Sequence, residues 1–168
     1  MSFIKKLNII FLTITLFSFI LLMYSWYNDK EFDDNPLSNE IQKEIATKRL
    51  KITKLIRDKY RIDFKIPLLV TNKMNSKLFG LTSYDTKTQD IKIYLNKKRF
   101  KESKNYMLED VIPHEYAHAL MFWFGDFSSE NSGHTVTWQK ICKNLDGKRC
   151  DRFVNHNDIL IDKTKLPF

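Results

Sequence analysis

The longest apolar stretch of the chain lies near its N-terminus, where no charged side chain occurs from Leu7 to Tyr27. A helix of this length would reach roughly 31 Å, which matches a bilayer core of about 30 Å. A buried helix of a soluble protein normally keeps a polar face, whereas this stretch is apolar all round. The pattern predicts one transmembrane helix over residues 7–27.

The charges around this stretch predict its orientation. Lys5 and Lys6 precede it, and an acidic segment follows it. Because basic residues favour the cytoplasmic side, we expect a single-pass protein with a cytoplasmic N-terminus and its remaining residues in the periplasm or outside the cell. A cleaved signal peptide is the alternative, but the apolar run ends at residues 23–27 without alanine or glycine and with interfacial aromatic residues. We therefore predict residues 1–30 as an uncleaved membrane anchor.

Helical and extended patterns follow the anchor. Residues 28–37 are acidic, contain an Asn-Pro pair and predict a short linker. Apolar residues at helical spacing predict an amphipathic helix over 39–60. Residues 66–70 form a short apolar run with a proline near its start, which is typical of a strand. The segments 80–84 and 91–95 flank a polar stretch and predict a β-hairpin with one buried face.

The second half of the chain is mainly helical in period. Residues 106–124 predict a helix that ends at Gly125. Pro113 interrupts this segment, so one bent helix and two separate helices both fit. Residues 126–133 predict a polar loop, and a further helix is expected to begin at His134. The mixture of elements indicates an α+β fold.

One motif within the expected helix carries the chemistry: His114-Glu115-Tyr116-Ala117-His118, an H-E-x-x-H sequence. Residues four apart lie on one helix face, so the two imidazoles can bind the same cation. Zinc suits imidazole nitrogen and lowers the pKa of a bound water to about 7. Glu115 lies about 100° around the helix from His114, from where it can accept a proton from that water. The alternative is a coincidental pair of histidines in a core helix.

A catalytic zinc needs a third protein ligand and one open position. His134 is the strongest candidate because it starts the expected helix and shares a face with Trp138, so its ring should point inward. A helix-capping or core histidine is the alternative for this residue. Asp126 and Glu130 are weaker candidates, since they lie in a polar loop, and His156 is expected to be a surface or core residue.

The segment from Val111 to Leu120, followed by Gly133-His134 and then Trp138, resembles the SprT-like zinc metallopeptidases. The hairpin between Gly80 and Leu95 resembles the small sheet that precedes the motif in this family. The resemblance covers residues 39–146 and implies a zincin-like domain with a small, mostly antiparallel sheet, one catalytic Zn²⁺ and two helices that meet at it. We accordingly predict residues 31–168 as the metallopeptidase domain. The resemblance implies these site residues: His114, His118 and His134 as zinc ligands, and Glu115 as the catalytic acid/base.

Charge and cysteine content bear on location and partners. The chain carries 28 basic and 20 acidic residues. Residues 1–30 contain three basic residues and one acidic residue, so the remaining 25 basic and 19 acidic residues give a net charge of +6. Such a charge suits an anionic surface such as lipid headgroups, with an ordinary solvated surface as the alternative. Cys142 and Cys150 are expected to form a disulfide if the domain is exported, and two free thiols otherwise.

Several further segments have competing interpretations. The aromatic run 122–124 is expected to pack beneath the zinc helix rather than line a cleft. The strand 91–95 is a candidate outer strand for pairing with an extended peptide. The basic segment 97–104 is expected to be a solvated loop. Three residues remain open as stabilisers of a developing oxyanion: Tyr84, Tyr94 and His156.

The sequence therefore favours a membrane-anchored zinc metallopeptidase that acts on protein or peptide outside the cytoplasm. A membrane-tethered, zinc-stabilised binding module without protease activity is the alternative, and it would bind the same metal. A cytoplasmic, nucleic-acid-associated protease is a third interpretation; it requires residues 7–27 to be buried in the globule, and we do not favour a nucleic-acid partner.

Overall fold

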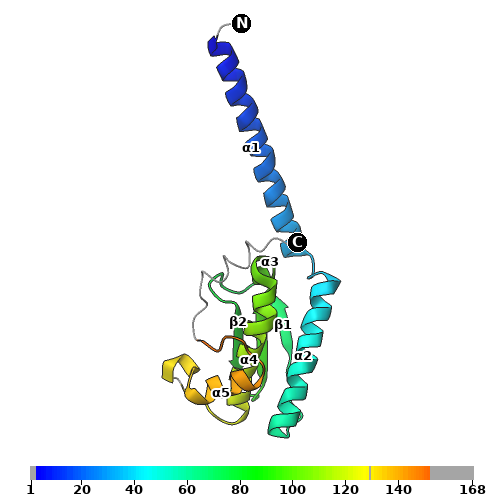
Figure 1. The fold of residues 1–168 in the computed structure, drawn as a ribbon, viewed down its shortest axis with the longest axis vertical. Coiled ribbons are helices and arrows are strands. Elements are labelled where there is room, and N and C mark those ends of the chain that lie inside the picture. The colour runs from blue at the N-terminus through cyan, green and yellow to red at the C-terminus, as the bar shows by residue number, and fades with distance from the viewer. Residues whose placement is uncertain (1–2, 129, 152–168) are drawn as a thin grey trace. The chain divides into compact units, whose positions relative to one another are not determined.

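The structure is a computed structural model that describes residues 3–128 and 130–151 (Figure 1). The chain divides into two compact units at the boundary between Leu37 and Ser38. In the second unit one helix precedes three strands, and further helices follow them. This order is an α+β arrangement and confirms the expected fold class.

The first unit is formed by α1 (Phe3–Asp34), a single helix in which no residue is buried. It is long and apolar enough to cross a membrane by length and composition, with a mean hydropathy of 2.2 over its most apolar window. The helix continues through most of the segment expected as a linker. Nothing in the sequence breaks a helix before Asn35-Pro36, and the residue before a proline is disfavoured in helical conformation.

The second unit begins with α2 (Asn39–Tyr60), which confirms the amphipathic helix expected over these residues. The Ser38 side chain accepts a hydrogen bond from the backbone N–H of Ile41, which satisfies one unpaired donor of the first turn. The helix contacts α4 in the same unit. Its buried apolar residues lie on one face at helical spacing: Ile45, Ile52 and Ile56.

Three strands form one small sheet: β1 (Leu68–Thr71), β2 (Gly80–Tyr84) and β3 (Ile91–Asn96), in the order β1-β3-β2. The expected hairpin is confirmed, since β2 and β3 pair antiparallel. The expected mostly antiparallel sheet is wrong, because β1 pairs with β3 in parallel and the sheet is mixed. The reason is that β3 inserts between the two earlier strands and runs in the same direction as β1.

The central strand β3 is the most buried of the three. Ile91, Ile93 and Leu95 are all buried, and α4 packs over β2 and β3. β1 and β2, which flank it, contain no buried residue. The expectation that residues 91–95 form an outer strand is therefore wrong. In the described chain the edge strands are β1 and β2.

The basic segment after β3 is a helix rather than the expected loop. α3 (Lys97–Tyr106) begins at Asn96, whose side chain accepts a hydrogen bond from the backbone N–H of Lys98. Phe100 is 2% exposed and anchors the helix in the core. A capping asparagine and one buried aromatic residue therefore outweigh the polar character of this segment.

A π-helical turn, η1 (Met107–Val111), connects α3 to α4 (Ile112–Trp123). Pro113 lies in the first turn of α4, and the backbone angles at the junction are helical, with φ/ψ of −68°/−44° at Val111 and −61°/−51° at Ile112. Of the two arrangements that the sequence left open, the structure therefore has one continuous helical segment, with a π turn before the proline, rather than two separate helices. Gly125, with φ of 76°, follows its C-terminal end as expected.

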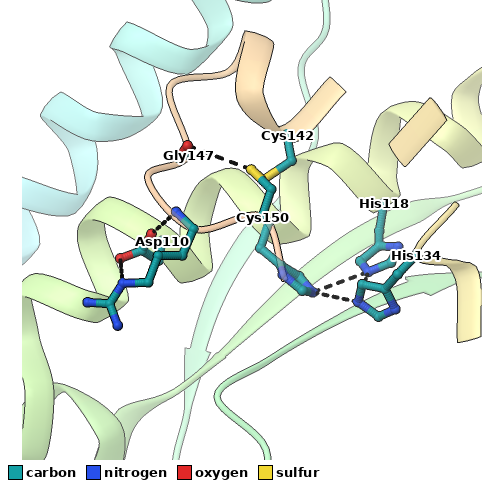
Figure 2. The surroundings of a disulfide bond; sticks show 8 residues. Asp110, His118, His134, Cys142, Gly147 and Cys150 are labelled. Atoms are coloured by element: carbon teal, nitrogen blue, oxygen red, sulfur yellow. Dashed lines mark hydrogen bonds and ion pairs between the residues drawn. A yellow bond between two sulfur atoms is a disulfide. The ribbon is translucent and has the colours of Figure 1, made fainter. Parts of the chain in front are cut away.

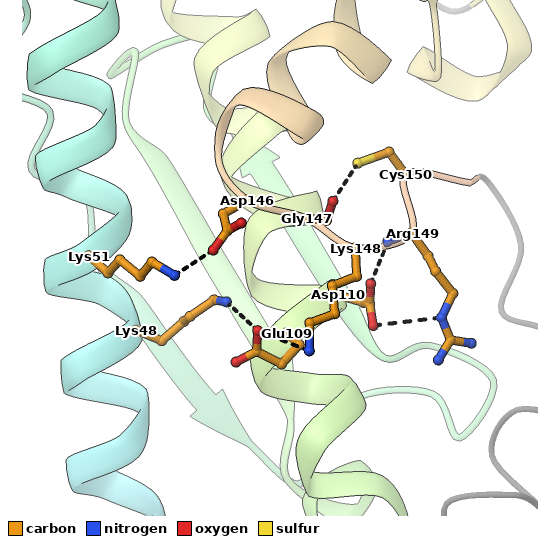
Figure 3. A network of polar contacts seen from close by, with 9 residues as sticks. All are labelled: Lys48, Lys51, Glu109, Asp110, Asp146, Gly147, Lys148, Arg149 and Cys150. Carbon is orange, nitrogen blue, oxygen red and sulfur yellow. Dashed lines mark hydrogen bonds and ion pairs between the residues drawn. The ribbon is translucent and has the colours of Figure 1, made fainter.

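The last described helix is α5 (Val136–Asn144), which Thr135 caps through a hydrogen bond from the backbone N–H of Trp138. His134 therefore precedes the helix instead of starting it, which corrects the expected boundary. Cys142 of α5 forms the expected disulfide with Cys150. The segment between them is held to η1 because the backbone N–H of Arg149 donates to Asp110 at 2.6 Å (Figure 3).

Candidate metal centre

Two imidazoles of the H-E-x-x-H motif lie on the same face of α4. His114 and His118 are one turn apart, and their Nε2 atoms are 3.3 Å from each other. The proline in the first turn and the apolar residues around the motif set α4 against the sheet, so this face is turned into the domain. The local sequence alone therefore places two of the three expected ligands together.

The third imidazole comes from the loop before α5. Nε2 of His134 lies 3.1 Å from that of His114 and 3.2 Å from that of His118. Figure 2 shows the rings of His118 and His134 turned toward the same point. Gly133 precedes the ring with φ of 81°, a backbone conformation that favours glycine.

The triangle of nitrogens fits a divalent cation better than a hydrogen-bonded cluster. Each nitrogen of a neutral imidazole is either a hydrogen-bond donor or an acceptor. Among three nitrogens in mutual contact, at least one pair must therefore be two donors or two acceptors, which cannot form a hydrogen bond. Four ligands at the zinc–nitrogen distance of about 2.0–2.1 Å in a tetrahedron lie about 3.3–3.4 Å apart. The spacings here are 3.1–3.3 Å, and these atoms form the one group of potential metal ligands found among the described residues.

The protonation of the rings also favours metal binding. Burial, and to a smaller extent the charges that His118 and His134 would carry, together lower the pKa of His114 to about 3. Burial and His134 likewise lower the pKa of His118 to about 3. Both rings are therefore neutral over the physiological range, which is the form that offers a lone pair to a cation.

Trp138 packs against the cluster from α5. Its side chain is fully buried, and its ring centroid lies 4.6 Å from that of His114 and 4.5 Å from that of His134. Both contacts are edge-to-face. The indole therefore restricts the rotation of rings that come from two different segments.

Glu115 faces the same cavity as the three rings. A cavity of about 750 Å³ is lined by all four predicted site residues. Glu115 is 6% exposed, and burial raises the pKa of its carboxyl to about 7, although a hydrogen bond with Thr82 acts in the opposite direction. A cation bound nearby would lower this pKa, because it favours the ionised form. Without a cation this carboxyl therefore exchanges its proton near neutral pH, and a cation would favour the ionised form that a general base requires.

The structure separates the other candidates from the cluster. Asp126 lines the cavity, but neither it nor Glu130 belongs to the group of histidine nitrogens. Tyr84 and Tyr94 do not line the cavity. His156 lies outside the described residues.

The expectation for the aromatic run 122–124 is wrong. Phe122 lines the cavity, whereas Trp123 and Phe124 are 53% and 51% exposed. The reason is that α4 ends here, so successive side chains leave the packed interface. Trp123 packs at its edge against Phe64.

Sequence reasoning missed the residues that β2 contributes. Gly80 and Thr82 line the cavity, and both approach Glu115 closely. Tyr106 of α3 lines it as well. No local pattern marks these residues, since the contact between Thr82 and Glu115 spans 33 positions of the chain.

Comparison with known proteins gives one match. The model of the SprT-like family matches residues 22–159, which is most of the chain. No curated protein and no solved structure matches this chain. The matched range contains the H-E-x-x-H motif, His134 and the strand that faces Glu115.

Proposed function

The chain belongs to the SprT-like family, and from this premise we propose that it is a zinc metallopeptidase. His114, His118 and His134 are the proposed ligands, and Glu115 is the proposed general base. The observation that carries the proposal is the triangle of Nε2 atoms at 3.1–3.3 Å beside a buried carboxylate in one cavity.

The chain's own residues divide the work of peptide hydrolysis. When bound, zinc lowers the pKa of a coordinated water and polarises the carbonyl of the scissile bond. His114, His118 and His134 would hold the ion through one neutral imidazole nitrogen each and would leave room for a water or a substrate oxygen. Glu115 accepts the proton of the attacking water and can return it to the leaving amine. Its neighbour His114 holds the metal from the same helix, so one rigid element positions base and ligand.

The proposed substrate is an extended segment of protein or peptide. β2 is an edge strand, and its residues Gly80, Leu81 and Thr82 line the cavity. An edge strand offers unpaired backbone groups to which a peptide can add as a further strand. We therefore assign to β2 the role that the sequence had suggested for residues 91–95.

We further propose that α1 anchors the protein in a membrane with the catalytic domain on the non-cytoplasmic side. Lys5 and Lys6 precede the apolar stretch, which favours a cytoplasmic N-terminus. The Cys142–Cys150 disulfide supports this orientation, since disulfides persist in oxidising compartments. The basic surface suits anionic lipid headgroups. Protease added to sealed right-side-out vesicles should digest the catalytic domain, because this domain would lie on their outer surface. Protection of the domain in these vesicles would mean that it lies on the cytoplasmic side.

The enzymatic proposal is tested with the full chain in detergent and a labelled unfolded protein as substrate. We expect the wild type to cleave it, a zinc chelator to abolish cleavage, and Glu115→Gln to abolish cleavage while the zinc content stays unchanged. Glu130→Gln is the matched control, because this exposed carboxylate lies outside the histidine cluster, and it should retain activity. A wild type that binds zinc without cleaving protein would favour a zinc-stabilised binding module instead.

A further inference from the structure

We propose, on the basis of the proposed function, that Thr82 is a positioning residue that holds the Glu115 carboxylate in its working orientation. Gly80 lies against the other side of the same carboxylate, and we call Gly80 and Thr82 together the seat of Glu115. Both residues belong to β2, so the strand proposed to receive the substrate also fixes the base.

The hydroxyl of Thr82 contacts Glu115 at two atoms. Its Oγ1 lies 2.8 Å from Oε2 of the carboxylate and 2.9 Å from the main-chain carbonyl oxygen of the same residue. The hydroxyl carries one hydrogen and donates it to one of these two acceptors at a time; donated to Oε2, it restricts the rotation of the glutamate side chain. Oε2 is held by this contact, and Oε1 is left on the side of Gly80.

Gly80 contributes to the seat because it has no side chain, which leaves room for the carboxylate of Glu115. A Cβ atom built on it would lie 2.5 Å from Oε1 and 2.7 Å from Cγ of Glu115. Real side-chain atoms do not approach so closely, so any larger residue would displace the carboxylate. Gly80 and Thr82 are two positions apart on a strand and therefore face the same side of the sheet, toward α4.

The seat is built on a rigid part of the domain. Thr82 lies opposite Ile93 in the β2–β3 register, and Ile93 is fully buried at the centre of the sheet. A hydrogen-bonded strand restricts the hydroxyl more than a loop would. Residues that orient reacting groups in this way typically change activity by about 10- to 100-fold when they are removed.

The test compares three variants of the full chain. Thr82→Val removes the hydroxyl at nearly constant shape, and Thr82→Ser retains it. Thr47→Val is the matched control, because it makes the same change in α2, where the hydroxyl donates to the carbonyl oxygen of Lys43. We expect Thr82→Val to lower kcat by about 10- to 100-fold with KM and zinc content unchanged, whereas Thr82→Ser and Thr47→Val stay within a few-fold of the wild type.

A second measurement does not depend on activity. Thermal unfolding of the metal-free chain is compared for Thr82→Val, Glu115→Ala, which removes the accepting oxygen, and the double variant. Because the two side chains are in contact, the loss of Tm in the double variant should be smaller than the sum of the two single losses. Additive losses would mean that the hydroxyl does not interact with the carboxylate.

The outcomes separate this inference from the proposed function. An active wild type with an equally active Thr82→Val variant would overturn the inference alone. Loss of zinc in Thr82→Val would also overturn it, since the residue would then support the metal site rather than the base. A wild type without chelator-sensitive cleavage would overturn the proposed function and, with it, the positioning role.

Discussion

The indole of Trp138 stacks on the ring of His118, with 5.2 Å between the ring centroids and an interplanar angle of 28°. Trp138 belongs to α5, and His118 belongs to α4. The contact therefore joins α5 to the helix that carries two of the three candidate ligands. It is one of three such contacts, since Trp138 also packs against His114 and His134.

Truncation of this indole should damage both the core and the metal site. For Trp138→Ala we expect a loss of about 3–5 kcal/mol in the free energy of unfolding, because the side chain is fully buried. Zinc affinity should fall as well, because the rings lose a common support. Urea unfolding with and without zinc measures both effects. Trp123→Ala is the control: its side chain is 53% exposed, and a loss equal to that of Trp138→Ala would contradict this account.

The disulfide should stabilise the segment that follows α5. Cys142 and Cys150 are eight positions apart, and closing a loop of this length stabilises a protein by about 2–3 kcal/mol in the chain-entropy model. We therefore expect a reductant to lower the Tm of the wild type. The double variant Cys142→Ala/Cys150→Ala should have a low Tm in both conditions. A wild-type Tm that does not respond to complete reduction would show that the bond contributes nothing.

An ion pair between α2 and η1 should make stability depend on pH. Nζ of Lys48 lies 3.0 Å from Oε2 of Glu109, and the lysine side chain is only 7% exposed (Figure 3). Burial raises the pKa of Glu109, but the hydrogen bond and the charge of Lys48 outweigh it and hold this pKa below its usual value of 4.5. Glu109→Gln should therefore cost about 1–2 kcal/mol at neutral pH, discounted because Glu109 is about one-third exposed.

The sign of this dependence follows from the lowered pKa. A carboxyl whose folded pKa lies below its unfolded value contributes stability above the unfolded pKa and loses it as the pH falls through the folded one. The difference between wild type and Glu109→Gln should thus be full at pH 7 and shrink below about pH 4.5. Burial raises the pKa of Asp110, which acts in the opposite direction, but both proteins contain this residue. Urea unfolding across pH checks the trend, and a difference that grows in acid would contradict it.

Local patterns predicted the elements best where their cause is local. Ser38 caps α2, and the i, i+4 spacing of His114 and His118 sets two rings on one helix face. The resemblance to the SprT-like family is confirmed by the family match. The assignment of individual ligands stays a prediction, although the three expected rings converge.

Capping residues mark the starts of two helices that composition alone does not predict. Thr135 marks the true start of α5, so His134 belongs to the preceding loop. Asn96 marks the start of α3 within a segment expected to be a loop. In both cases a polar side chain accepts a hydrogen bond from the first helical turn, which outweighs the composition of the segment.

Non-local relationships could not be predicted from the pattern. The parallel pairing of β1 with β3 depends on which strand occupies the centre of the sheet, and period alone does not decide this. The contact between Thr82 and Glu115 likewise exists only after the hairpin packs against α4. Sequence reasoning therefore found the metal-binding motif but not the seat of its base.

The zinc content of the purified full chain tests the central claim most directly. We compare the wild type, His134→Ala and Glu115→Gln after removal of loosely bound metal. The account predicts about one zinc per chain in the wild type and in Glu115→Gln, and a clear loss in His134→Ala, because two imidazoles from one helix turn do not complete the site. Equal zinc content in the wild type and His134→Ala would contradict the three-histidine centre.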